Sequence, residues 1–245
     1  MEVSITGAKI YYVIPGINYP ITQTVVNAWI AMVVIVGLCI WLTRGMQVHA
    51  RTKRQVVAEM IVQKAQKLVR GTMGAKWDSF VPFIAAILSM SVVSSLMGLT
   101  GAYSPTNDLN TFLAWGILVF VLITYHKIKA NGFGGYLKSF TEPIFVMTPM
   151  NIISEIATPI SMSLRHFANI CSGYVIGLLL YAALGAVSQM IFFWLPGSLG
   201  TIPFLQVGIP AVLNVYFSVF SGCVQPYIFC MLTMQFVAQA AGTEE

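Results

Sequence analysis

The fold of this chain is decided by the stretch from Pro159 to Gly173, which reads Pro-Ile-Ser-Met-Ser-Leu-Arg-His-Phe-Ala-Asn-Ile-Cys-Ser-Gly. Arg165 at its centre is the only charged residue between Glu155 and Glu244, in a segment dominated by apolar side chains. A cation at the centre of a bilayer costs roughly 2.5–3.5 kcal/mol on insertion scales. We therefore interpret Arg165 as a functional charge inside a membrane-spanning helix.

The composition indicates an integral membrane protein. The chain has 245 residues, of which 57% are hydrophobic and only 9% are charged, whereas a soluble globular chain carries about 25% charged residues. We expect one all-α polytopic domain over residues 1–245, with about five membrane-crossing helices, two of them long and tilted, plus an amphipathic interfacial helix. The net charge of +5 is concentrated in two segments, so it indicates membrane topology and not a nucleic-acid surface.

Four segments divide this domain. Residues 1–43 combine a polar lead, which turns at Pro15-Gly16, with a first uncharged span. Residues 44–76 carry eight basic residues and one acidic residue among apolar residues at helical spacing, which predicts an amphipathic helix on the cytoplasmic face. Residues 80–126 predict a helical hairpin with a turn at 104–110. Residues 143–240 contain two apolar runs that are too long for perpendicular helices, so we expect them to be broken or strongly tilted.

A second basic segment, predicted to be a loop, contains Lys127, Lys129 and Lys138. Two spans separate it from residues 44–76, so both basic segments fall on one side of the membrane. The positive-inside bias then places them in the cytoplasm and the N-terminus outside. Five crossings bring the C-terminus to the cytoplasm as well.

Two polar stripes follow the long apolar runs. At about 100° per residue, one helix face carries Thr158, Ser161, Arg165, Asn169 and Ser172. The second stripe steps by four, three and four residues through Asn214, Ser218, Ser221 and Gln225. Polar stripes inside a bilayer face protein or water, so the two suit a hydrated ion path beside a fixed positive charge. For each polar residue taken singly, hydrogen bonding between helices is the alternative.

These ordered motifs resemble those of subunit a of F-type ATP synthases. The family signature reads approximately Pro-x-Asn-x-x-x-Glu, then Pro-x-Ser-x-x-x-Arg-x-Phe-x-Asn, with a Gly four residues later. The residues of this chain in register are Pro149, Asn151, Glu155, Pro159, Ser161, Arg165, Phe167, Asn169 and Gly173. A later Gln of the family, set before an aromatic-Ile-Phe run, resembles Gln225. The resemblance covers residues 80–240 well and the N-terminal part mainly by layout.

The resemblance implies a stator function in a rotary enzyme. An ion would enter by an outer half-channel, neutralise a carboxylate of the subunit c rotor ring, ride the ring and leave by a cytoplasmic half-channel. Arg165 would keep the facing carboxylate ionised by lowering its pKa and would block a direct leak. Candidates for the outlet are Glu155, Thr158 and Ser161, and those for the inlet are Asn169, Asn214 and Asp108. Gln225 is expected to face Arg165.

The same resemblance implies partners and location. Besides the rotor ring, we expect the peripheral-stalk subunit b, the soluble F1 sector and membrane lipid as partners, in a cell inner (plasma) membrane. No nucleotide loop, nucleophile–base pair or metal-ligand cluster stands out in the sequence, so we expect a non-catalytic subunit without cofactor or metal. A secondary transporter, the alternative, would show paired repeats with broken helices. An intramembrane hydrolase would show clustered Glu/His or Asp pairs; the sequence shows neither pattern.

Four positions depart from the family pattern: His166, Ala168, Tyr174 and Ser218. Relatives often carry an acidic residue or His where Tyr174 stands, and a titratable residue where Ser218 stands. These departures leave the inlet residues and the choice between H⁺ and Na⁺ open, and the ring size and the bacterial or organelle origin stay open too. For His166, a packing or lipid-interface role and a relay role are equally compatible with the sequence.

Overall fold

The computed structural model describes residues 9–16, 19–47, 52–98, 103–141, 145–192 and 204–242. A few side chains within these ranges, including those of Tyr174, Asn214 and Ser218, lie outside the description. In chain order, the elements are β1 (Ile10–Ile14), β2 (Tyr19–Thr22), α1 (Gln23–Thr43), α2 (Lys53–Met73), η1 (Ala75–Phe80), α3 (Val81–Met97), η3 (Pro105–Asn107), α4 (Leu109–Thr141), η4 (Phe145–Met147), α5 (Thr148–Phe192) and α6 (Phe204–Ala240).

The expected number of membrane-crossing helices is confirmed. Within the described residues, five helical stretches are long and apolar enough to cross a bilayer, and they coincide with α1, η1–α3, α4, η4–α5 and the second half of α6. At about 1.5 Å per residue, the 45 residues of α5 extend far beyond a hydrocarbon core of about 30 Å. Helix α5 is continuous through Pro159, so of the two sequence-based expectations, broken or strongly tilted, the helix is not broken at this proline.

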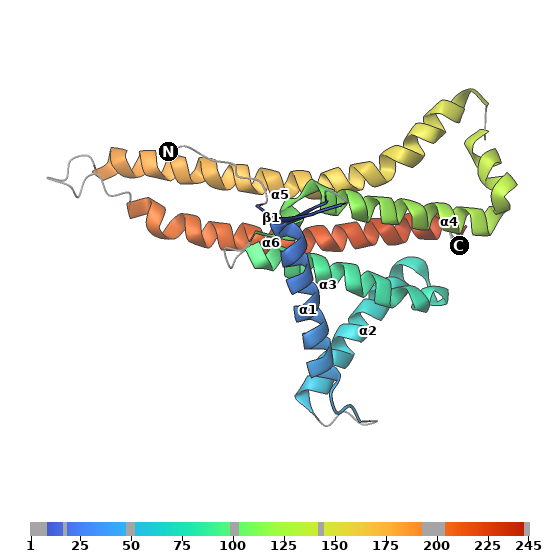
Figure 1. Ribbon diagram of the computed structural model, residues 1–245, viewed down its shortest axis with the longest axis horizontal. Helices are drawn as coiled ribbons and strands as arrows, with labels where there is room; N and C mark the ends of the chain where they lie inside the picture. Colours follow the sequence, from blue (N-terminus) through green and yellow to red (C-terminus); the bar gives the residue numbers. More distant parts are fainter. Residues whose placement is uncertain are drawn as a thin grey trace.

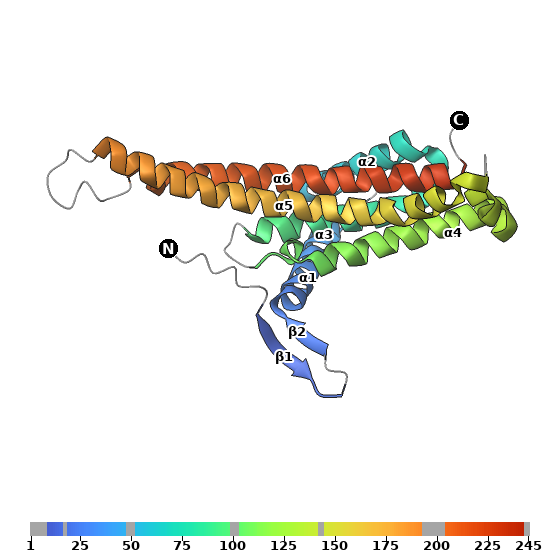
Figure 2. The same cartoon turned by 90° about the horizontal axis from the view of Figure 1, so that it is seen from above.

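The arrangement separates one helix from the others. Helices α5 and α6 run side by side along the longest dimension of the molecule, with α3 and α4 beside them (Figures 1 and 2). Helix α1 crosses this group at a steep angle (Figure 1). If α1 crosses the bilayer close to its normal, α5 and α6 lie strongly tilted, as the sequence predicts.

A β-hairpin precedes α1, where the sequence analysis expected only a polar lead with a turn. Strands β1 and β2 pair antiparallel, with a register irregularity between Ile10 and Tyr12. Gly16 in the turn has a φ of 114°, a conformation that favours glycine. The predicted turn at Pro15-Gly16 is therefore present, and the two strands are an addition to an otherwise helical fold.

Helix α2 occupies the segment predicted to be interfacial. It begins at Lys53, and its exposed side chains combine basic residues with the apolar residues Val56, Val57, Met60, Ile61 and Val62. Arg70 near its end donates to the Asp78 carboxylate of η1, with its Nε 2.7 Å from Oδ1. This hydrogen bond raises the pKa of Arg70. The pair ties α2 to the start of the next span.

The second basic segment is helical, so its prediction as a loop was wrong. Helix α4 continues from Leu109 to Thr141 and includes all three lysines. The helical conformation is interrupted only at Gly132, whose φ is 70° within the helix. Because glycine adopts this conformation without steric cost, the chain can change direction there and keep its helical hydrogen bonds on both sides.

Close contacts between small residues hold the helices together. A Cβ on Gly116 of α4 would lie 2.1 Å from the Ser163 Oγ of α5, and a Cβ on Gly222 of α6 would lie 2.8 Å from the Ser95 Cβ of α3. Membrane helices approach closely at such residues because lipid provides no hydrophobic force between them. The buried apolar core lies among α2, α3, α4 and α6, with Met162 contributed by α5.

Candidate functional site

Arg165 lies on an open face of α5. Its side chain is exposed, and it lines a groove of about 600 Å³. The groove is lined by Ile153, Ile156, Ala157, Ile160, Ser161, Leu164, Arg165 and Ala168. In the part of the chain that the structure describes, no carboxylate forms an ion pair with Arg165. The face is therefore an apolar strip with one cation, suited to an apolar partner that carries a carboxylate.

The two polar stripes predicted from the sequence contact each other between α5 and α6. The Asn169 amide of α5 donates to the Ser221 hydroxyl of α6 over 3.1 Å. Helices α5 and α6 are antiparallel neighbours (Figure 1), so a residue four positions before Asn169 lies at the level of one four positions after Ser221. Those two positions are Arg165 and Gln225.

Gln225 thus shares the level of Arg165 but occupies a different environment. Its side chain is buried at 8% exposure, whereas that of Arg165 is exposed. No hydrogen bond joins the two side chains in the described structure. The expectation that Gln225 faces Arg165 therefore stays a prediction, and the register that would permit it is present.

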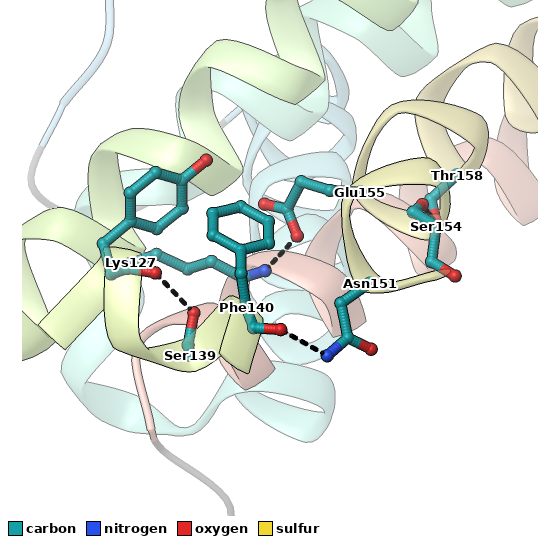
Figure 3. A network of polar contacts seen from close by, with 8 residues as sticks. Lys127, Ser139, Phe140, Asn151, Ser154, Glu155 and Thr158 are labelled. Carbon is teal, nitrogen blue, oxygen red and sulfur yellow. Dashed lines mark hydrogen bonds and ion pairs between the residues drawn. The ribbon is translucent and has the colours of Figure 1, made fainter. Parts of the chain in front are cut away.

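The outlet candidates Glu155 and Thr158 line a polar cavity between α4, α5 and α6 (Figure 3). Its volume is about 310 Å³. The lining residues are Ile123, Lys127, Ser139, Phe140, Asn151, Ser154, Glu155, Thr158, Phe236, Gln239 and Ala240. The Asn151 amide donates to the Phe140 carbonyl over 2.8 Å, which fixes the start of α5 against the end of α4.

Lys127 is the residue of this cavity that sequence reasoning missed. Its ammonium forms an ion pair with the Glu155 carboxylate (Figure 3), and the two side chains are 29% and 13% exposed. The sequence analysis used Lys127 only as one of the basic residues that indicate which side of the membrane is cytoplasmic. The available clue was Glu155 itself, because a carboxylate in an apolar segment needs a cationic partner, and Lys127 follows directly after the apolar part of α4.

Ser161, the third outlet candidate, lies elsewhere. It lines the Arg165 groove and not the cavity of Glu155. Ser172 is exposed, and its hydroxyl donates to the Asn169 carbonyl of its own helix over 3.0 Å. Asn214 and Ser218 fall on α6, and their side chains, like that of Tyr174, lie outside the described part of the structure.

Asp108, an inlet candidate, lies in the turn before α4, near the start of α1. The Thr24 hydroxyl donates to its carboxylate over 3.1 Å, and the nearby Asn27 amide donates to the Tyr103 carbonyl over 2.6 Å. Partial burial and the Asp108 charge raise the pKa of Tyr103. No described contact joins Asp108 to Asn169 directly.

A row of buried hydroxyls leads inward from this turn. The Ser104 hydroxyl, 2.5 Å from that of Thr106, donates to the Ser94 carbonyl of α3. The side-chain hydroxyls of Ser91, Ser94 and Ser95 are buried and have no partner among the described residues. Such groups cost about 1–3 kcal/mol each when unsatisfied, and water satisfies them in many proteins. The row reaches α6 where Ser95 contacts Gly222.

His166 packs inside the helix bundle. It is 2% exposed and stacks on Phe112 of α4, with ring centroids 4.1 Å apart. Phe229 of α6 approaches it edge-on at 6.1 Å. The lipid-interface alternative is therefore excluded for this conformation. The stack also orients α5, because Arg165 and His166 are adjacent and point about 100° apart.

In the described residues, no group of three or more His, Cys, Asp or Glu side chains is arranged to hold a metal ion. The polar atoms of the site belong to the Arg165 guanidinium, to amides and hydroxyls, and to the Lys127–Glu155 ion pair. Together they provide a lone cation on an open face, a polar cavity on one side and a row of hydroxyls on the other.

Comparisons with known proteins show the family of this chain. The chain is 31% identical over 228 residues to ATP synthase subunit a 1 of Prosthecochloris aestuarii, covering 92% of each chain. It is 30% identical to ATP synthase subunit a of Desulforamulus reducens, covering 96% of this chain and 84% of the relative. It is also 28% identical to the sodium-ion-specific ATP synthase subunit a of Propionigenium modestum, covering 93% of this chain and 77% of the relative. The profile of the ATP synthase A chain family matches residues 25–238, and the chain therefore belongs to this family, the membrane-embedded subunit a of F-type ATP synthases.

Proposed function

We propose that this chain couples ion flow to rotor rotation through Arg165. The observation that carries the proposal is the exposure of this one cation within an apolar groove on α5. A rotor helix that presents a carboxylate would complete the groove and pair the charge. Opposite Arg165 the carboxylate is held ionised, because a nearby cation lowers the pKa of an acid, and so it releases its ion there. The chain itself makes and breaks no covalent bond.

The outlet half-channel is assigned to the cavity of Lys127, Glu155 and Thr158. Three features support it: the polar lining, the volume of about 310 Å³, and the position of the cavity beside the basic end of α4. The Lys127–Glu155 ion pair would place two opposite charges at the exit. Ser161, which lines the Arg165 groove, would instead lie at the rotor face.

The inlet half-channel is assigned to the opposite part of the bundle. Asp108, Asn169, Ser172, Ser221 and, from the sequence pattern, Asn214 and Ser218 are its proposed polar residues. The unpartnered hydroxyls of Ser91, Ser94 and Ser95 extend the proposal to α3, since they lie between the Asp108 turn and α6. Gln225, at the level of Arg165, would separate the inlet from the outlet.

We further propose the orientation and partners of the chain. The α2–α3 junction, the basic end of α4 and the end of α6 lie at the same end of the long helices (Figure 1). This arrangement supports a cytoplasmic location for all three, with the N-terminus outside. The proposed partners are the subunit c rotor ring on the Arg165 face, the peripheral-stalk subunit b, and the F1 sector through the complex, in a cell inner membrane.

Replacement of Arg165 tests the coupling function. Arg165→Ala in the assembled synthase should abolish ATP synthesis driven by an imposed ion gradient in vesicles, while the chain still assembles with its partners. Arg165→Lys should also lose most of its ATP synthesis, because Lys lacks the planar guanidinium of Arg and loses its proton more readily when buried. Normal synthesis by the Ala variant would refute the proposal. ATP-driven pumping by the unmodified enzyme, with and without Na⁺ and an uncoupler, identifies the ion.

A further inference from the structure

The β-hairpin of residues 9–22 exposes apolar side chains from consecutive positions. Ile10, Tyr11 and Tyr12 are 57–61% exposed, and Val13 is exposed as well. Tyr12 and Val13 pair in regular register with Ile21 and Pro20. Because consecutive strand residues point to opposite faces, these two residues place an apolar side chain on each face of β1. A soluble hairpin would place polar residues on at least one face. This pattern calls for an apolar environment that the described residues do not supply.

The base of the hairpin adjoins a helix that is long and apolar enough to cross a bilayer. Helix α1 has 21 residues, which at about 1.5 Å per residue span about 31 Å, the thickness of the hydrocarbon core. Its first residue, Gln23, follows β2 directly, and its backbone N–H donates to the Lys9 carbonyl over 2.8 Å. From Ile10 to Thr43 the sequence contains no Asp, Glu, Lys or Arg. The uncharged surface of α1 therefore continues without interruption into the hairpin.

The direction of the strands relative to α1 indicates how the hairpin would lie in a bilayer. In Figure 1 the hairpin lies at the upper end of α1, whose axis runs down the picture. In Figure 2, which views the molecule from above, the strands extend toward the bottom of the picture, away from α3 to α6. The hairpin thus runs across the α1 axis. If α1 crosses the bilayer near its normal, the hairpin lies parallel to the membrane surface.

We propose that the hairpin strands β1 and β2 lie flat in the boundary between lipid headgroups and acyl chains, and anchor the start of α1 there. Tyrosine is enriched at this depth because its ring is apolar and its hydroxyl is polar. An isolated two-stranded hairpin is marginally stable in water, and the lipid boundary supplies the missing apolar partner for its faces. Lys9, at the base, places its ammonium among the headgroups.

An environment-sensitive label on Tyr12 tests this inference. The four native cysteines are replaced by Ala, Tyr12→Cys is labelled with a nitrobenzoxadiazole dye, and the assembled synthase is reconstituted in phosphatidylcholine vesicles. We expect emission shifted to the blue, and quenching by lipids with a nitroxide at carbon 5 that exceeds quenching by lipids with a nitroxide at carbon 12. The same dye at Lys64→Cys on the basic part of α2 serves as the control, with strong quenching by aqueous iodide.

Each other outcome overturns the inference. Iodide quenching at position 12 equal to that at position 64 would place the hairpin in water. A blue shift without quenching by the nitroxide lipids would mean that a protein surface, such as another subunit, covers it. Since Tyr12 is exposed, the labelled enzyme should keep its ATP synthesis, which is measured in the same vesicles. The result does not depend on the role proposed for Arg165.

Discussion

The Asn169 amide of α5 and the Ser221 hydroxyl of α6 are 3.1 Å apart, and this contact sets the register in which Arg165 and Gln225 share one level. We predict that Asn169→Cys combined with Ser221→Cys will be joined by a short bifunctional thiol reagent when the native cysteines are absent. Leu164→Cys with Ser221→Cys is the control, since Leu164 points about 140° away from Asn169 on the helix. Equal yields from both pairs would contradict the register.

The ion pair between Lys127 and Glu155 should control flow through the outlet. Removal of one partner of a buried ion pair destabilises a protein by roughly 3–5 kcal/mol. Because the Lys127 side chain is 29% exposed, we expect a cost near the lower end of this range. We expect Glu155→Gln to lower gradient-driven ATP synthesis by roughly tenfold or more, which corresponds to at least 1.4 kcal/mol. Exchange of the charges in Lys127→Glu with Glu155→Lys should restore part of the rate.

Ser139→Ala is the matched control for this prediction. Ser139 lines the same cavity, but its hydroxyl donates only to the Tyr136 carbonyl of its own helix over 2.7 Å. Its removal should leave ATP synthesis within about twofold, because surface changes of this kind cost less than about 0.5 kcal/mol. If Glu155→Gln behaved like Ser139→Ala, the cavity would not be the outlet.

The spans and the meeting of the polar stripes could be predicted from sequence because they depend on local patterns. A charge-free run of sufficient length specifies a crossing helix, and helical periodicity alone placed Asn169 and Ser221 on stripes that could face each other. The family resemblance then supplied the expected functions of Arg165 and Gln225. No comparable local signal marked β1 and β2, whose pairing connects two short uncharged strands across a turn.

The contacts that sequence reasoning missed depend on the packing of distant helices. Lys127 and Glu155 are separated by 28 positions, and only the antiparallel packing of α4 on α5 brings them together. Ser91 and Ser94 look like ordinary small residues of a membrane helix until burial shows that their hydroxyls lack partners. His166 could not be assigned from sequence, because its environment consists of Phe112 and Phe229 from two other helices.

Gly116 should be required for the packing of α4 on α5. A Cβ there would lie 2.1 Å from the Ser163 Oγ and 3.0 Å from the Pro159 carbonyl oxygen. Overpacking of this kind typically costs about 1–3 kcal/mol, so Gly116→Ala should lower the midpoint of thermal unfolding of the assembled complex. Adding Ser163→Ala should recover part of the loss. Gly134→Ala is the control: nothing lies within 4 Å of the added carbon, so the midpoint of thermal unfolding should not change. An equal decrease of the midpoint for both variants would contradict the proposed packing role of Gly116.

The orientation of the chain is tested by labelling cysteines from one side of the membrane. Residues 44–76 carry eight basic residues, whereas residues 1–43 carry one, and the basic side of a membrane protein faces the cytoplasm. In intact cells with the native cysteines replaced, an impermeant thiol reagent should therefore label Lys9→Cys at the base of the hairpin, but not Lys64→Cys on α2. In inverted vesicles the pattern should reverse. Labelling of position 64, but not position 9, from outside the cell would mean that the chain has the opposite orientation. The Glu155 cavity would then face the outside and could not be the outlet.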